Sequence, residues 1–358
     1  MKEMSVLCIW DRMGDYHLAR IKACRERIKG NVYSADLGAA DSLYQWDNVD
    51  ANHHYMLSEQ PVHKKDFIHR FKMYRSILRE KNISHVAMGY GRMEYLVFLL
   101  YARLTGCKTI VFCESWYTRG QIKDFFKSLL LKTIGNAFFV SGQRAYNHFV
   151  KNYRINAASV FTGYSVVDNT HFVLNEQIPK KYLLCVARYS EEKNLEFLIR
   201  AFVGSRLSET YELLMIGDGP LREELSNTIR LLKTDRVILS GWKTYKELPF
   251  VYAGAIACIL PSTFEPWGLV VNEAMAVGLP VLLSDECGCL PDLLVQNENG
   301  WRFNPYHANE LLNILNDINV LDREMLYKMG GCSKVLIDFY SVDTWAEKIN
   351  TMLTMNLG

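Results

Sequence analysis

Two glutamates in the segment STFEPWGLVVNEAMAV (262–277) are the side chains best placed to do chemistry in this sequence. Glu265 and Glu273 enclose seven residues in a stretch that is otherwise mostly apolar. On a helix this spacing separates the carboxylates by ~12 Å along the axis, too far for them to share a proton or a metal ion. They could instead accept hydrogen bonds from hydroxyl groups at two ends of one extended ligand. The alternative is a helix-terminal charge at Glu265 and an exposed Glu273, but a carboxylate among small apolar residues is costly unless it is hydrogen-bonded.

Two cations follow another apolar segment. Arg188 and Lys193 come after YLLCVA (182–187), where we expect a helix to begin. Two positive charges beside the N-terminal amides of a helix suit an anion such as a diphosphate. The alternative is a solvated helix start with surface cations.

Backbone amides next to Glu265 could add to an anion site. Gly268 has no side chain, so the amides of Gly268, Leu269 and Val270 could approach a phosphate closely. Pro266 suits the first turn of a helix, so we expect a helix to begin there.

The elements that must position these residues alternate along the chain. Helical patterns occur at 66–81, 194–202 and 244–254, and a terminal helix is expected near 343–354. Strands that are apolar on both faces and alternate with helices indicate parallel sheets covered on both sides, so we expect two doubly wound α/β domains facing a central cleft. The expected strands are 5–10, 31–37, 85–90, 108–114, 137–142, 159–164, 182–187, 212–217, 236–241, 255–262 and 280–285.

A polar, proline-containing segment at 174–181 marks the expected domain boundary. We expect domains at 1–172 and 173–340, with residues 341–358 crossing back to the first domain. The charge changes sign here as well: residues 1–172 carry 24 Lys and Arg against 15 Asp and Glu, or +9, which leaves 17 against 24, or −7, for the remainder. A basic half can face nucleic acid, phospholipid or a phosphorylated acceptor, but the sequence has no nucleic-acid recognition motif, so we expect no nucleic-acid partner.

The composition predicts a reducing environment. The chain has 358 residues and nine cysteines, an odd number that mostly lies in apolar strand-like segments, and only Cys287 and Cys289 approach a metal-type spacing. Met1 leads directly into a strand with no visible secretory signal, and no apolar run reaches the ~18 residues of a membrane-spanning helix. We therefore expect a cytoplasmic protein, at most peripheral to the inner face of a membrane, without disulfides or zinc.

The second half resembles the family 4 retaining glycosyltransferases of GT-B fold. The resemblance lies in VARYSEEKNLEFLIRAF, IGDGPLREEL, LSGWKTYKELPFVYAGA and the long segment from PSTFEPWGLVVNEAMAVGLP to ENGWRF, and Glu-x₇-Glu is its most specific part. It implies that the second domain binds a nucleotide-sugar donor. Arg188, Lys193 and the Gly268–Val270 amides would contact the diphosphate, Glu265 the sugar hydroxyls and Glu273 the ribose.

The first half departs from the family pattern. Relatives have a glycine-rich loop after the first strand, where this chain has only Gly14, and many have a histidine where this chain has Glu114 and Ser115. Gly14 is therefore a weak candidate for donor binding. Glu114 could orient an acceptor hydroxyl or act as an acid/base group, or it could be a satisfied structural carboxylate.

The resemblance implies a retaining, hexosyltransferase-like reaction that needs no metal or other cofactor, and the chain has no Asp-x-Asp pair. We expect a glycan or lipid-linked acceptor of surface-polysaccharide synthesis. The alternatives are a nucleotide-sugar epimerase of the same fold and a non-catalytic sugar-nucleotide-binding protein. Two basic segments with aromatic residues, 63–81 and 119–132, could lie on an anionic membrane, or their aromatic stripes could be core.

Overall fold

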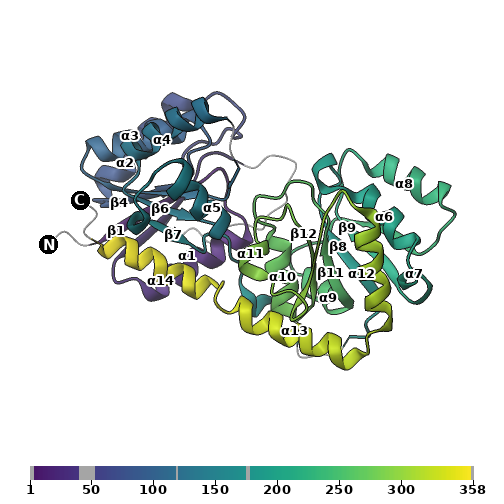
Figure 1. The fold of residues 1–358 in the computed structure, drawn as a ribbon. Coiled ribbons are helices and arrows are strands. Elements are labelled where there is room, and N and C mark those ends of the chain that lie inside the picture. Colours follow the sequence, from purple (N-terminus) through teal and green to yellow (C-terminus); the bar gives the residue numbers. More distant parts are fainter. Residues whose placement is uncertain (1–3, 40–52, 118–119, 175–177, 356–358) are drawn as a thin grey trace. The chain divides into compact units, whose positions relative to one another are not determined.

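The computed structural model describes residues 4–39, 53–117, 120–174 and 178–355, which form two compact units. Unit 1 comprises residues 1–167 and 342–358, and unit 2 comprises residues 168–341. Each unit has its own parallel sheet with helices packed against it (Figure 1). Within the described residues, the two sheets have the α/β, doubly wound, Rossmann-like organisation that the sequence predicts.

Unit 1 is built on a sheet with the strand order β3-β2-β1-β4-β5-β6-β7. Its strands are β1 (Ser5–Trp10), β2 (Asn31–Asp36), β3 (His54–Met56), β4 (His85–Met88), β5 (Lys108–Cys113), β6 (Ala137–Val140) and β7 (Val160–Thr162). Its helices are α1 (Asp15–Arg27), α2 (Phe67–Glu80), α3 (Met93–Leu104), α4 (Gln121–Ile134), α5 (Gln143–Asn147) and α14 (Val342–Thr354). Every residue of β1, β4 and β6 is buried, as expected for strands covered on both faces.

Unit 2 has the strand order β10-β9-β8-β11-β12-β13. Its strands are β8 (Tyr182–Val186), β9 (Glu212–Ile216), β10 (Val237–Gly241), β11 (Ala255–Leu260), β12 (Val281–Ser284) and β13 (Gly300–Phe303). Its helices are α6 (Leu195–Val203), α7 (Leu207–Thr210), α8 (Arg222–Leu231), α9 (Leu248–Ala253), α10 (Leu269–Val277), α11 (Leu290–Leu293), α12 (Ala308–Val320) and α13 (Arg323–Ile337).

The chain order reverses at one point in each sheet. In unit 2, β8 pairs with β9 on one side and with β11 on the other. β8 and β11 lie side by side, and the loops that follow them begin next to each other at the carboxyl edge of the sheet and then lead away in different directions. Doubly wound folds bind ligands at this point. Arg188 and Lys193 follow β8, and Glu265 and Gly268 follow β11, so the fold brings the two candidate segments to one place.

The unit boundaries differ slightly from the predicted 172/173 and 340/341. Asn169–Phe172 form a 3₁₀ turn in unit 2, where the His171 ring stacks on Tyr245 at 3.8 Å and Phe172 contacts Tyr252. These aromatic contacts make the segment part of unit 2, although it precedes the polar segment used to place the boundary. Residues 175–177 of that segment lie outside the described residues.

The terminal helix α14 packs along α1 within unit 1 (Figure 1). Trp345 and Ile349 are fully buried, and Lys348 Nζ donates to the Thr162 carbonyl at 2.6 Å. Arg27 pairs with Asp343 at 2.6 Å. The last helix in the sequence is therefore part of the first unit's core.

Candidate functional site

Lys193 and Glu265 form an ion pair at the reversal point of unit 2. Lys193 Nζ lies 2.5 Å from Glu265 Oε2, and the side chains are only 17% and 11% exposed. Ser262 Oγ lies 3.4 Å from the same carboxylate oxygen. The sequence assigns Lys193 to the diphosphate and Glu265 to the sugar hydroxyls, and it does not predict their direct contact. A poorly hydrated pair of this kind fixes both charges in position.

The two loops that carry this pair are also joined through their backbones. The Thr263 amide donates to the Glu192 carbonyl at 2.9 Å, and the Gly288 amide donates to the Glu265 carbonyl at 2.9 Å. Glu265 also forms an isolated bridge with Cys287. Glu265 is therefore held through its carboxylate by Lys193 and Ser262, and through its backbone by Cys287 and Gly288.

Lys193 lies just before α6, around the start of a helix as the sequence predicts. It ends a short 3₁₀ turn, Glu191–Lys193, and the left-handed Asn194 (φ 54°) separates it from the helix. Arg188 is exposed in the segment between β8 and this turn. Burial opposes ionisation of Glu192, but the hydrogen bond from Ser190 and the charges of Lys193 and Arg188 outweigh it, and the net effect lowers the Glu192 pKa.

Gly268 begins the helix that follows Glu265. It is the N-cap of α10 with φ 101°, a left-handed conformation that L side chains rarely adopt. An added Cβ would lie 2.7 Å from Leu260 Cδ2. Leu269 and Val270 are the first two residues of α10, where helix amides have no intrahelical acceptor. The prediction for Pro266 is wrong, because the helix begins three residues later.

Trp267 explains why the helix starts late. Its side chain is 2% exposed, and its indole donates to Asn272 Oδ1 at 2.8 Å. Its carbonyl accepts from the Cys289 amide at 3.2 Å. The buried indole therefore anchors the loop between Glu265 and Gly268. Sequence reasoning missed this positioning role, although a large aromatic residue between a proline and a glycine was a visible signal.

Glu273 lies on the buried face of α10. Its side chain is 2% exposed, and its Oε2 accepts from the Tyr252 hydroxyl at 2.6 Å. Tyr252 comes from α9 and is itself fully buried. The alternative of an exposed Glu273 is therefore wrong, and Tyr252 is a second positioning residue that the sequence did not reveal.

The glycine turn after β9 has an architectural role. A Cβ on Gly217 would lie 1.9 Å from the Ala187 carbonyl oxygen, and one on Gly219 would lie 2.5 Å from that of Tyr189. Both glycines thus allow this turn to pack against the segment that carries Arg188.

The two remaining candidates belong to unit 1. Gly14 is the N-cap of α1, and its amide donates to His17 Nδ1 at 3.2 Å, so this amide already has an acceptor within the chain. Glu114 follows β5; its Oε1 accepts from Ser165 Oγ at 2.8 Å, and its carbonyl accepts from Ser141 Oγ at 3.0 Å. Both residues lie at the carboxyl edge of the unit 1 sheet.

A buried arginine accompanies Glu114. Arg20 is 1% exposed, donates through Nη2 to the Val166 carbonyl at 2.7 Å and lies 5.2 Å from the Tyr164 ring centroid. Burial lowers the Arg20 pKa, while nearby Tyr164 and Glu114 act in the opposite direction. No sequence pattern singled out Arg20, because α1 also carries Lys22, Arg25 and Arg27 and nothing distinguished Arg20 from a surface cation.

Cys287 and Cys289 are buried thiols. Burial is the largest cause that raises both pKa values, that of Cys287 to about 12. Across the described ranges, no group of three or more His, Cys, Asp or Glu side chains could hold a metal ion. The independence of metal that the resemblance implied stays a prediction.

Comparison with known proteins shows which family the second half resembles. Residues 166–330 match the glycosyl transferases group 1 family. An uncharacterized glycosyltransferase of Methanocaldococcus jannaschii is 28% identical over 177 residues, covering 48% of this chain and 44% of its own. The sulfoquinovosyl transferase of Arabidopsis thaliana is 33% identical over 178 residues, covering 49% of this chain and 33% of its own. The alignments thus span less than half the length of these relatives.

Solved structures match the whole chain. Sucrose-phosphate synthase from Thermosynechococcus elongatus superposes with a TM-score of 0.77 at 17% identity, covering 98% of both chains. Anabaena HepE in complex with UDP gives a TM-score of 0.77 at 17% identity, covering 98% of this chain and 99% of that one. At this identity the likeness concerns the fold, which is the two-domain GT-B arrangement of Rossmann-like sheets. Residues 166–330 thus match the glycosyl transferases group 1 family, and the chain has a GT-B fold.

Proposed function

We propose that this protein is a retaining glycosyltransferase that moves a sugar from a nucleotide-sugar donor to a hydroxyl acceptor. The observation that carries the proposal is the Lys193–Glu265 ion pair beside the start of α10, with Glu273 buried on the same helix. Family membership supports it, as do the structural neighbour in complex with UDP and relatives described as sugar transferases.

The proposed donor site divides the ligand among these groups. Arg188, Lys193 and the amides of Leu269 and Val270 contact the diphosphate, because cations and helix N-terminal amides favour negative charge. Glu265 accepts hydrogen bonds from the sugar. Glu265 contacts Lys193, so the carboxylate proposed to bind the sugar lies next to the cation proposed to bind the diphosphate. This suits the point at which the sugar is joined to the diphosphate. Glu273 accepts from the ribose, with Tyr252 fixing its carboxylate.

The proposed reaction relies on charge stabilisation. The bond between the anomeric carbon and the phosphate oxygen breaks, and the acceptor oxygen bonds the same carbon on the same face. The acceptor proton passes to the departing phosphate. Negative charge grows on the leaving nucleoside diphosphate, so preorganised cations and amides lower the barrier without a metal ion.

A donor assay tests the proposal. The full chain is incubated with UDP-, GDP- and ADP-sugars, with and without glycan or lipid-linked acceptors, and the products are followed by mass spectrometry. Transfer should be lost in Lys193→Met and kept in Lys243→Met, a surface cation of the same unit paired with Glu247. Isomerised donor without transfer would favour the epimerase, and tight donor binding without release of diphosphate would favour a non-catalytic protein.

We propose a lipid-linked acceptor reached at an anionic membrane surface. None of the helices in the described parts of the chain combines the length and hydrophobicity needed to cross a bilayer. Two neighbouring helices of unit 1 instead expose apolar stripes at helical spacing, which we call the α3–α4 apolar face. It consists of Met93, Val97, Leu100 and Leu104 on α3 and of Ile122, Phe125, Phe126, Leu129 and Leu130 on α4, all between 36% and 78% exposed.

The two basic segments of unit 1 differ in how far their aromatic and apolar residues are buried. On α2, Tyr74 and Leu78 are buried and Phe71 packs against the core, so the core alternative holds for these three residues, whereas Phe67 at the start of the helix is 39% exposed. On α4 the aromatic residues are exposed, and Lys123 and Lys132 are exposed on the same helix. Exposed apolar residues with flanking lysines match the chemistry of an anionic bilayer surface. Residues 118–119 lie outside the described part of the chain.

Vesicle binding tests this contact. The full chain should co-sediment with vesicles containing phosphatidylglycerol more than with phosphatidylcholine vesicles, and less at high salt. The double variant Phe125→Ser/Leu129→Ser should lose binding, whereas Phe339→Ser, an exposed aromatic residue of unit 2, should not. Equal sedimentation of all variants would refute the proposed surface. A concentration-dependent dimer that the double variant abolishes would instead assign the face to a second copy of the chain.

A further inference from the structure

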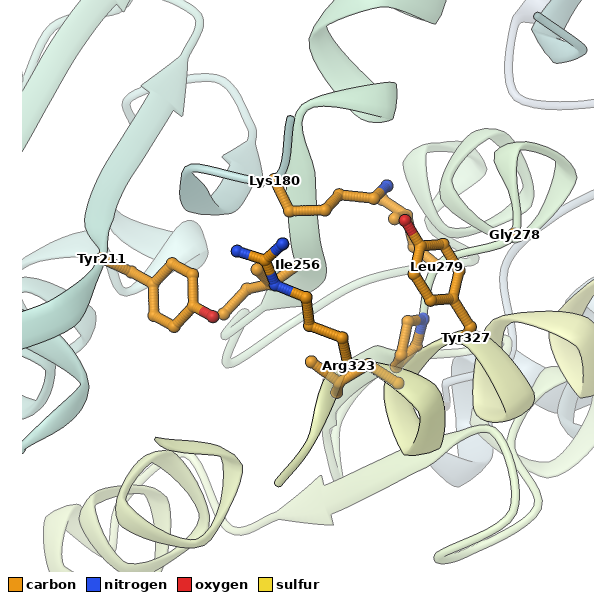
Figure 2. A pocket seen from close by; sticks show the side chains of 9 residues that line it. Lys180, Tyr211, Ile256, Gly278, Leu279, Arg323 and Tyr327 are labelled. Carbon is orange, nitrogen blue, oxygen red and sulfur yellow. The ribbon is translucent and has the colours of Figure 1, made fainter. Parts of the chain in front are cut away.

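A hollow in unit 2 lies at the opposite edge of the sheet from the candidate donor site (Figure 2). It is lined by residues next to the amino ends of the strands: Lys180 precedes β8, Tyr211 precedes β9, Ile256 is the second residue of β11 and Pro280 precedes β12. Arg188, Lys193 and Glu265 follow the carboxyl ends. A strand of five residues spans ~17 Å, so the hollow is a separate place.

Positive charge gathers around the hollow. Lys180 and Arg323 line it, and Arg323 is the first residue of α13. The side chain of Lys334 packs closely against Gly278, another lining residue: a Cβ on Gly278 would lie 2.8 Å from Lys334 Cε. Among the residues that the structure describes, none of these three cations forms an ion pair. Two carboxylates adjoin Arg323 in the sequence: Asp322 caps α13 by accepting from the Met325 amide at 2.7 Å, and Glu324 is exposed in the first turn of that helix.

Lys180 is the most enclosed of the three cations. Its ammonium donates to the Ala253 carbonyl at 2.7 Å, which fixes its position and leaves further N–H groups for a ligand. Burial, assisted by the charge of Lys334, lowers the Lys180 pKa to about 8. The protein therefore charges this amine at a cost, and a bound anion would remove that cost.

The remaining lining groups suit a small oxyanion. The phenols of Tyr211 and Tyr327 border the hollow from opposite sides, with Arg323 between them (Figure 2). Each phenol can donate a hydrogen bond, and the guanidinium can donate two parallel ones to a phosphate. Ile256, Leu279 and Leu326 supply an apolar wall on the buried side of the hollow, whereas Arg323 and Tyr327 are exposed to solvent.

We propose that this hollow binds a phosphate-type oxyanion, held by Lys180 and Arg323 with Lys334 adding to the positive field. The ligand joins the segment that enters β8 to the start of α13, two parts of unit 2 that are far apart in sequence. Inorganic phosphate and a small phosphomonoester share this chemistry. The site is independent of the donor site, and its ligand stabilises unit 2 whether or not sugar transfer occurs.

Calorimetric titration of the full chain tests the proposal, with inorganic phosphate and glycerol 3-phosphate as separate probes. Because charge-assisted hydrogen bonds from both side chains would hold the phosphate, Arg323→Ala and Lys180→Met should each weaken phosphate binding by about tenfold or more. Lys328→Ala changes a cation five residues further along α13 that does not line the hollow, and it should leave phosphate binding unchanged. Tighter binding of glycerol 3-phosphate would assign the site to a phosphomonoester, and equal or weaker binding would assign it to free phosphate.

The donor site can also bind phosphate, so the same titrations are made in Lys193→Met. Binding that survives in Lys193→Met and is lost in Arg323→Ala supports the hollow. Binding lost in Lys193→Met but unchanged in Arg323→Ala overturns it, as does an absence of phosphate binding to the wild-type chain. Circular dichroism of each variant shows whether it is folded.

Discussion

At the scale of single residues, the Lys193–Glu265 pair decides how the proposed donor site responds to mutation. Each charge is the other's partner at 2.5 Å, and neither side chain is well exposed. In Glu265→Gln, Lys193 loses a competing carboxylate, so a diphosphate should bind as tightly as before or more tightly. The sugar loses its acceptor. We expect transfer to slow by about 100-fold, the range of one charged contact made in the transition state. Calorimetry with UDP and single-turnover kinetics separate these effects, and a Gln variant with wild-type kcat would contradict the role.

Glu273 should behave in the opposite way. Glu273→Gln keeps the shape but removes the charge that accepts from Tyr252 at 2.6 Å and, in the proposal, from the ribose. Affinity for the nucleoside diphosphate should fall about tenfold, with a smaller change in kcat. Tyr252→Phe is the companion variant, because it removes only the positioning hydroxyl and should cost less. If affinity were unchanged in both variants, Glu273 would be a structural carboxylate.

The sequence allowed the identities of these residues to be predicted, but not their pairing. The spacing of eight residues in the sequence separated Glu265 from Glu273, whereas the contact of Glu265 with Lys193 joins residues 72 positions apart. Such a contact depends on β8 and β11 lying side by side, which no local pattern states. Trp267 and Tyr252 were missed for the same reason, since each acts through tertiary packing.

At the scale of elements, the start of α10 depends on a glycine. Gly268→Ala would place a Cβ 2.7 Å from Leu260 at a φ of 101°. We expect a loss of about 1–3 kcal/mol in the free energy of unfolding and weaker nucleotide binding, because the first amides of α10 would shift. Gly331→Ala in α13 is the control, since a Cβ there meets nothing within 4 Å and should be neutral or stabilising. Chemical denaturation measures both, and equal effects would show that backbone conformation at Gly268 is unimportant.

Element types followed well from the sequence because most strands are apolar on both faces. All eleven predicted strands are present, several with ends shifted by a residue or two. β3 (His54–Met56) and β13 (Gly300–Phe303) were missed. Both lie at sheet edges, where one face or side is exposed and the apolar signal is short. The predicted helix at 244–254 begins only at Leu248, since the preceding residues form a turn.

At the scale of the whole molecule, unit 1 should be sensitive to acid. Burial, assisted by Arg20, lowers the pKa of His17 to about 3, and burial, assisted by Lys108, lowers the pKa of His85 to about 4. Both are neutral in the folded state at pH 5, whereas the unfolded chain binds protons below about 6.5. Stability is therefore lost as pH falls from about 6.5 toward 4, at up to about 1.4 kcal/mol per pH unit for each histidine.

His17→Gln tests this dependence. Glutamine keeps an acceptor for the Gly14 amide but does not titrate. The slope of the free energy of unfolding against pH, measured between pH 7 and 5, should fall by up to the equivalent of one bound proton, or about 1.4 kcal/mol per pH unit. An unchanged slope would mean that His17 is protonated in the folded state.

The two units have separate cores, so unit 2 should fold alone. A fragment of residues 168–341 contains the whole β8–β13 sheet and its helices. It should unfold cooperatively in urea. A chain lacking residues 342–358 should instead lose stability in unit 1, because α14 buries Trp345 and Ile349 against it. A molten fragment or an unaffected truncated chain would contradict this division.

The most direct measurement for the account is a crystal structure of the chain with a nucleoside diphosphate, beginning with UDP. We predict that the diphosphate binds at Lys193 and the first amides of α10 and that the ribose hydroxyls donate to Glu273. A well-ordered nucleotide bound elsewhere, with the Lys193–Glu265 pair and Glu273 free of contact, would contradict it.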